Sequence, residues 1–68
     1  MEFAMTTTTL HRAEIARQRR QIVELQAELA QASAADREII ESLIADARRA
    51  IAWCQREIAR ELVAAAYA

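Results

Sequence analysis

Hydrophobic residues recur at helical spacing along the first half of the chain. Ile15, Ile22 and Leu29 follow one another every seven residues, and Leu25 lies three residues after Ile22. This spacing is typical of a coiled-coil-like stripe on one face of a helix. Gln18 interrupts the stripe. The pattern predicts a first helix over 10–31.

The residues before this helix give a weaker pattern. Thr6 to Thr9 form a run of β-branched residues, and threonine has only modest helix propensity. Threonine is, however, a good N-cap. We therefore expect Thr9 to cap the first helix and residues 1–9 to be flexible or extended.

The second half of the chain has two neighbouring apolar stripes. The first, which we call the seam, advances in steps of three and four residues through Ile40, Ile44, Ala47, Ile51, Cys54, Ile58 and Leu62. The other, which we call the second stripe, comprises Ile39, Leu43, Ala50, Trp53, Ala64 and Tyr67. Together they make an apolar face wider than one neighbouring helix can cover.

The break between the two halves contains neither of the usual helix breakers, because the 68 residues include no Gly and no Pro. Ser33, followed three residues later by Asp36, resembles a capping box. We expect a turn over 32–35 and a second helix over 36–68, with Ala34 as the first residue to enter it. The alternative is one continuous helix, since the residues around Ser33 tolerate helical geometry.

The expected fold is all-α, a two-helix antiparallel hairpin that dimerises into a four-helix bundle. A single core at this length contributes only about 3–5 kcal/mol, and one cysteine cannot form an internal disulfide. A second copy would cover the second stripe. The residues expected in the seam of the hairpin and dimer are Ile15, Ile22, Leu25, Leu29, Ile40, Ile44, Ile51, Cys54, Ile58 and Leu62.

Composition argues against several classes of function. The net charge is −1 and all nine basic residues are Arg, whereas a nucleic-acid-binding protein usually shows a basic excess. No apolar run reaches the roughly 18–20 residues that span a membrane, and the start lacks the features of a secretory signal. We expect a cytoplasmic protein without a cofactor or metal.

The residues capable of chemistry are few. Cys54 lies in the seam, where we expect a buried thiol. His11, the only histidine, begins the first helix and is expected to be solvated. A chain without glycine has no phosphate-binding loop, and one histidine without an acidic pair at helical spacing is not a catalytic or metal signal. We do not expect an enzyme.

The remaining candidates point to protein binding. Trp53 and Tyr67 are the only ring-bearing residues of the second helix, and Arg49, Arg56 and Arg60 lie close to Trp53 on its surface. Trp, Tyr and Arg dominate the hot spots of protein interfaces. We expect a regulator (inhibitor, anti-activator, adaptor or chaperone, conceivably of phage origin) that acts as a homodimer and sterically masks an unidentified partner protein.

A short segment resembles a known family. Glu41-Ser42-Leu43, with Cys54 eleven residues beyond Leu43, is similar to the second helix of the plasmid copy-number protein Rop. That resemblance covers four residues and implies a dimeric helical hairpin that binds RNA, although the RNA-contacting face of Rop has no counterpart assigned in this sequence. The alternative functions are therefore a Rop-like RNA-binding dimer and a small chaperone of the type III secretion kind.

Overall fold

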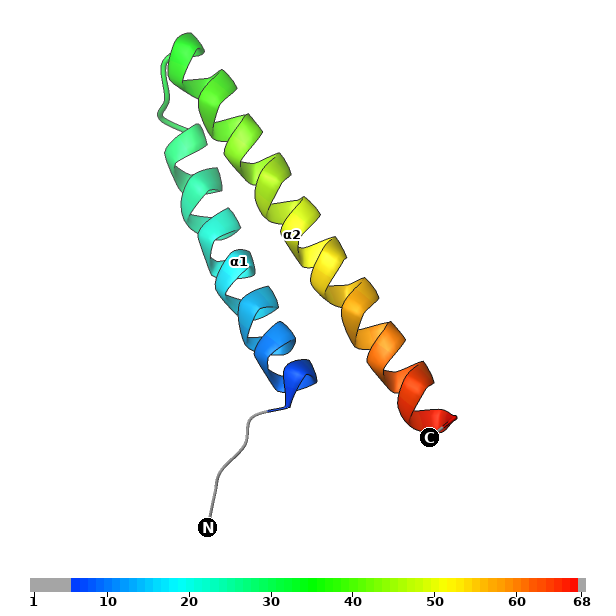
Figure 1. Cartoon of the computed structure of the whole chain (residues 1–68). Coiled ribbons are helices and arrows are strands. Elements are labelled where there is room, and N and C mark those ends of the chain that lie inside the picture. Colours follow the sequence, from blue (N-terminus) through cyan, green and yellow to red (C-terminus); the bar gives the residue numbers. More distant parts are fainter. Residues whose placement is uncertain (1–5, 68) are drawn as a thin grey trace.

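The computed structural model describes residues 6–67 and consists of two α-helices packed side by side. Helix α1 spans Thr7–Leu29 and helix α2 spans Ala34–Ala66. They run antiparallel, so that the start of α1 and the end of α2 lie at the end opposite the turn (Figure 1). The hairpin predicted from the sequence is therefore confirmed at the level of two packed helices, and the single continuous helix is excluded.

The start of α1 differs from the sequence expectation. The helix begins at Thr7 rather than Leu10, and the hydroxyl of Thr6, not of Thr9, accepts the capping hydrogen bond, from the Thr9 amide at 3.1 Å. The reason is a long-range contact, because the hydroxyl of Thr8 donates to Glu61 on α2. That contact holds the first turn in place. The earlier part of the expected N-terminal segment, residues 1–5, lies outside the described residues.

The turn needs no glycine because no residue within 6–67 has a positive φ. Helix α1 ends at Leu29, two residues before its expected end, and Ala30 keeps a right-handed φ of −62°. The amides of Gln31 and Ala32 donate to the carbonyls of Glu28 and Leu29, which tightens the last turn. The chain then becomes extended at Ser33.

Both helices are capped across this turn. The hydroxyl of Ser33 accepts a hydrogen bond from the Asp36 amide at 3.3 Å, so Ser33 is the N-cap of α2 and Ala34 its first residue. Arg37 reaches back from α2, and its Nη1 donates to the Leu29 carbonyl at 3.4 Å. One side chain of α2 thus gives the last carbonyl of α1 a second donor, beside the Ala32 amide.

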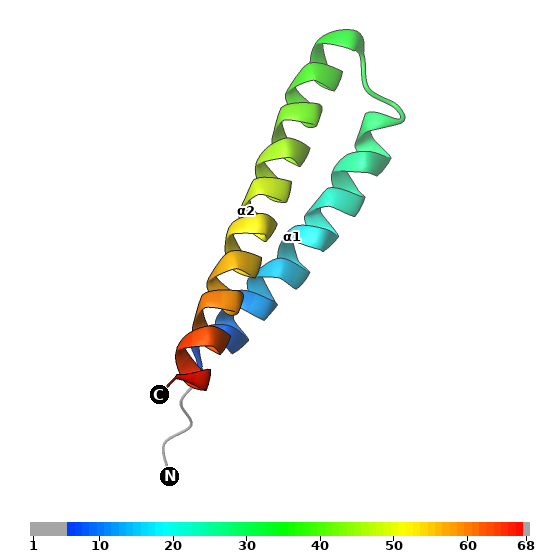
Figure 2. The same ribbon diagram turned by 90° about the vertical axis from the view of Figure 1, so that its right-hand side faces the viewer.

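The hairpin is a single layer. The Cα atoms span 52 × 27 × 12 Å, and the smallest dimension is about the 10–12 Å diameter of one helix. The two views at right angles show no second layer over either broad face of the described residues (Figures 1 and 2). Only the surfaces that the helices turn toward each other can be buried.

The core is correspondingly small. Its buried members are Ile15, Leu25, Ile44, Ala47 and Cys54. The Thr8–Glu61 contact sets the antiparallel register, so that Ile15, seven residues along α1, lies at the level of Cys54, seven residues back along α2. In the same register Leu25 lies at the level of Ile44. The large aliphatic residues of α1 thus lie level with alternating large and small residues of α2.

Loss of the α2 cap tests this account of the turn. Ser33→Ala removes the acceptor of the Asp36 amide, and we expect it to lower the free energy of unfolding by about 1 kcal/mol. The measurement is urea unfolding followed by circular dichroism.

The matched control is Ser42→Ala, because Ser42 is an exposed serine within α2. Alanine is the better helix former there, so this variant should be neutral or slightly stabilising. Equal destabilisation by both variants would contradict a capping role for Ser33.

Candidate functional site

The structure leaves much of the second stripe uncovered. The exposed fractions are 61% for Ile39, 51% for Trp53 and 88% for Tyr67, and Leu43 is exposed as well. Ala50 is partly buried and Ala64 is exposed. The second stripe, which was expected to need a partner, is therefore largely accessible to solvent in the isolated hairpin.

The expected seam residues do not share one environment. Four of them are buried: Ile15, Leu25, Ile44 and Cys54. Five are partly buried: Ile22, Leu29, Ile40, Ile51 and Ile58. Leu62 is the exception, with 57% exposure, because it lies at the level of Thr7, the first residue of α1. The part of α2 that extends past α1 therefore begins at Val63.

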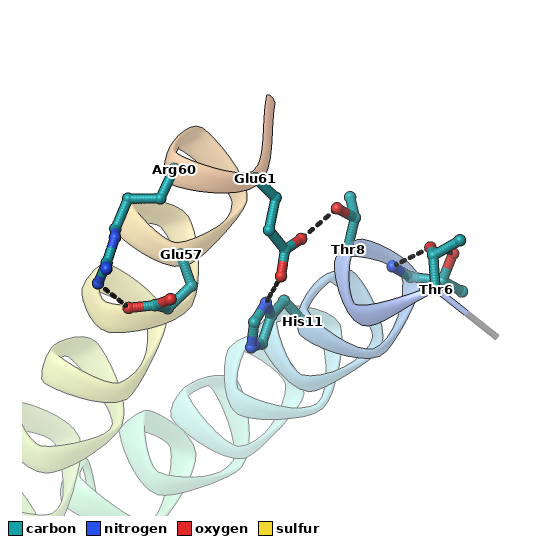
Figure 3. Close-up of polar contacts among 7 residues, drawn as sticks. Thr6, Thr8, His11, Glu57, Arg60 and Glu61 are labelled. Atoms are coloured by element: carbon teal, nitrogen blue, oxygen red, sulfur yellow. Dashed lines mark hydrogen bonds and ion pairs between the residues drawn. The ribbon is translucent and has the colours of Figure 1, made fainter. Parts of the chain in front are cut away.

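The open end of the hairpin, away from the turn, is held by polar side chains (Figure 3). The carboxylate of Glu61 lies between two residues of α1: one oxygen accepts from the hydroxyl of Thr8, and Oε1 lies 3.5 Å from Nδ1 of His11. These contacts replace the aliphatic pairs found nearer the turn. Glu61 therefore ties the first turns of α1 to α2.

His11 is not solvated, and the sequence expectation for it was wrong. Its side chain is only 15% exposed, and its ring meets that of Trp53 edge-to-face, with centroids 5.4 Å apart and planes at 89°. Among the described residues its buried Nδ1 has no hydrogen-bond partner. The burial of His11 could have been predicted from the sequence, because His11, Gln18 and Leu25 are seven residues apart and therefore lie on the same, buried face of the helix.

The arginines around Trp53 are mostly paired within α2. Arg49 bonds Asp46, and Nη1 of Arg60 lies 3.1 Å from Oε1 of Glu57. Each pair is three residues apart, and Arg56 is exposed beside them. Exposed pairs of this kind contribute little to stability, but they neutralise the basic side chains that phosphate binding would require.

A shallow surface depression lies on α2 near its end. It is formed by four small or flexible positions of one helix, Ala59, Arg60, Val63 and Ala64. It is a surface feature and not an enclosed active-site cavity.

The described residues contain no group of His, Cys, Asp and Glu side chains that could hold a metal ion. Neither helix within residues 6–67 is long and apolar enough to cross a membrane. Comparison with known protein families, curated proteins and solved structures gives no match for this chain. The arguments about function therefore rest on the two helices themselves.

The polar open end gives a second prediction. Glu61→Ala removes the acceptor of Thr8 and the carboxylate beside His11, and we expect the free energy of unfolding to fall by about 1–2 kcal/mol. Amide hydrogen exchange should also accelerate over the first turns of α1. The control is Glu41→Ala, an exposed position in the middle of α2, for which a change within about 0.5 kcal/mol is expected. Equal effects would rule out a special role for Glu61.

A third prediction concerns acid. Hydrogen bonds from Arg17 and Gln18 lower the pKa of Glu14 from 4.5 to about 2. Because the folded-state pKa is depressed, this pair stabilises α1 fully above about pH 4.5, and the contribution disappears as the pH falls toward 2. Carbon-detected NMR titration of Glu14 measures the pKa directly. In Arg17→Gln the pKa should move back toward 4.5, and an unchanged value would contradict the assigned cause.

Proposed function

We propose that this chain is a small non-enzymatic protein-binding regulator that acts as a helical-hairpin homodimer and sterically masks a partner protein. The observation that carries the proposal is the uncovered second stripe, with Trp53 half exposed at its middle. Contiguous exposed apolar surface on a small protein usually marks an interaction site.

The first partner is a second copy of the chain. Five residues are buried in the hairpin, which is little for a domain that must offset the entropy of ordering its backbone. Pairing two single-layer hairpins face to face adds the missing second layer. The result is a four-helix bundle with two-fold symmetry.

The bundle would act by covering a surface rather than by chemistry. Arg49 and Arg56 lie at one edge of the second stripe, beside Trp53, so the rim of the contact area carries guanidinium groups, and Arg49 would exchange its exposed partner Asp46 for an acid of the target. Guanidinium groups bind carboxylates in a planar, bidentate geometry. An acidic groove or interface on another protein is therefore the surface that this rim would fit, and occupying it would block access for other proteins.

The test of the proposal begins with assembly. Sedimentation equilibrium of the wild-type chain should show a dimer at micromolar concentration, and the midpoint of unfolding should rise with protein concentration. Leu43→Asp places a charge in the second stripe, and we expect it to weaken dimerisation about tenfold or more.

The matched control is Leu62→Asp, because Leu62 is exposed to a similar degree but lies on the opposite flank of α2. It should leave the dimer intact. A monomeric wild type, or equal loss with both variants, would refute the homodimer. RNA binding that weakens steeply with added salt would instead favour an RNA-binding dimer.

A further inference from the structure

We propose that the second stripe is self-complementary, so that α2 of a second copy lies antiparallel on it with Trp53 at the two-fold axis. This inference rests on the homodimer proposed above and adds its direction and its register. It concerns which residues of the two copies meet, and each step follows from positions on α2.

The first argument is the charge pattern of one column of α2. Residues at seven-residue intervals lie above one another on a packed helix. The column through Trp53 contains, in chain order, Ile39, Asp46, Trp53, Arg60 and Tyr67. Turning this column end for end about Trp53 places Asp46 opposite Arg60 and Ile39 opposite Tyr67. In an antiparallel dimer, the apolar residues of this column therefore face apolar residues, and each acid faces a base.

The second argument is steric. Leu43 lies ten residues before Trp53 and Val63 lies ten residues after it, so the same axis brings Leu43 of one copy to the level of Val63 of the other. Val63 is part of the depression that Ala59, Arg60 and Ala64 complete. On an ideal helix Leu43 and Val63 lie about 80° to either side of Trp53, so at this level an apolar side chain lines each edge of the contact.

The third argument is that the ion pairs within α2 can be exchanged. Asp46 pairs with Arg49, and Glu57 with Arg60, at exposed sites. In the proposed register Arg49 lies level with Glu57 of the second copy, and Asp46 lies level with its Arg60. Surface pairs contribute little on their own. Association can therefore exchange the internal partners of Asp46 and Arg60 for each other across the axis at low cost, while Arg49 and Glu57, on opposite sides of the Trp53 column, remain at the edges of the contact.

Other arrangements fit the charges badly. A parallel dimer in register places Asp46 against Asp46 and Arg60 against Arg60, and like charges across an interface are destabilising. An antiparallel copy shifted by one heptad places Asp46 against Trp53 and Ile39 against Arg60. That register buries charges without partners. The column therefore specifies one direction and one register.

Charge reversal in two separate chains tests the register. In Asp46→Arg the new arginine faces Arg60 twice across the axis, and in Arg60→Asp the new aspartate faces Asp46 twice. Each variant alone should dimerise about tenfold more weakly than wild type or worse. An equimolar mixture should recover dimerisation close to wild type, because both contacts in the mixed dimer are between opposite charges. Native mass spectrometry of chains differing in mass should show the mixed dimer as the main species.

Arg48→Asp is the control, because Arg48 is an exposed arginine about 140° around α2 from Trp53. It should not change dimerisation. No recovery in the mixture, or equal loss with Arg48→Asp, would overturn the proposed register. If one of these results is obtained while the wild type is dimeric, the proposed register is refuted and the homodimer is not. A monomeric wild type would overturn the homodimer as well.

NMR of the wild type avoids the risk that a variant fails to fold. Ile39 and Tyr67 are 28 residues apart on one helix, which corresponds to about 42 Å. A nuclear Overhauser effect between the Tyr67 ring and the Ile39 methyl groups can then arise only between copies. The proposal requires this signal at concentrations where the dimer dominates, and its absence there would overturn the register.

Discussion

Two helices in a single layer can bury only the residues along their shared seam, and this limit governs the rest of the molecule. A layer 12 Å thick leaves both broad faces of the hairpin open. The apolar face of α2 is wider than the surface that α1 covers, so Trp53 and Ile39 remain in contact with water. Exposure of these side chains is thus a direct consequence of the architecture, because residues 6–67 form no further element that could cover them.

The two ends of the hairpin are joined by different kinds of interaction. Near the turn Ser33 caps α2, and Arg37 links α2 to the end of α1. At the open end a carboxylate, a hydroxyl and an imidazole take the place of aliphatic contacts. Polar contacts of this kind add little net stability but are costly to leave unmade. They specify the register of the two helices, while the aliphatic residues between them supply most of the favourable burial.

Features of the fold that depend on residues close together in the sequence could be predicted, whereas features that depend on residues far apart in the sequence could not. The two helices, the cap at Ser33 and the burial of Cys54 follow from spacing and local propensity. The start of α1 does not, because Thr8 is held by Glu61, 53 residues away, and threonine propensity alone favours a later start. His11 was misplaced for a related reason. Its spacing to Gln18 and Leu25 was available, but two polar residues in succession concealed the buried face.

The exposed ion pairs beside Trp53 also bear on specificity. Asp46 and Arg60 stand one heptad to either side of Trp53, so a helix that settles on the second stripe must accommodate both charges. A helix that lacks an acid and a base at matching positions would desolvate them without compensation. Apolar surface alone would accept many partners. The two charges restrict the choice to helices with the complementary pattern, and α2 itself has that pattern when it is reversed.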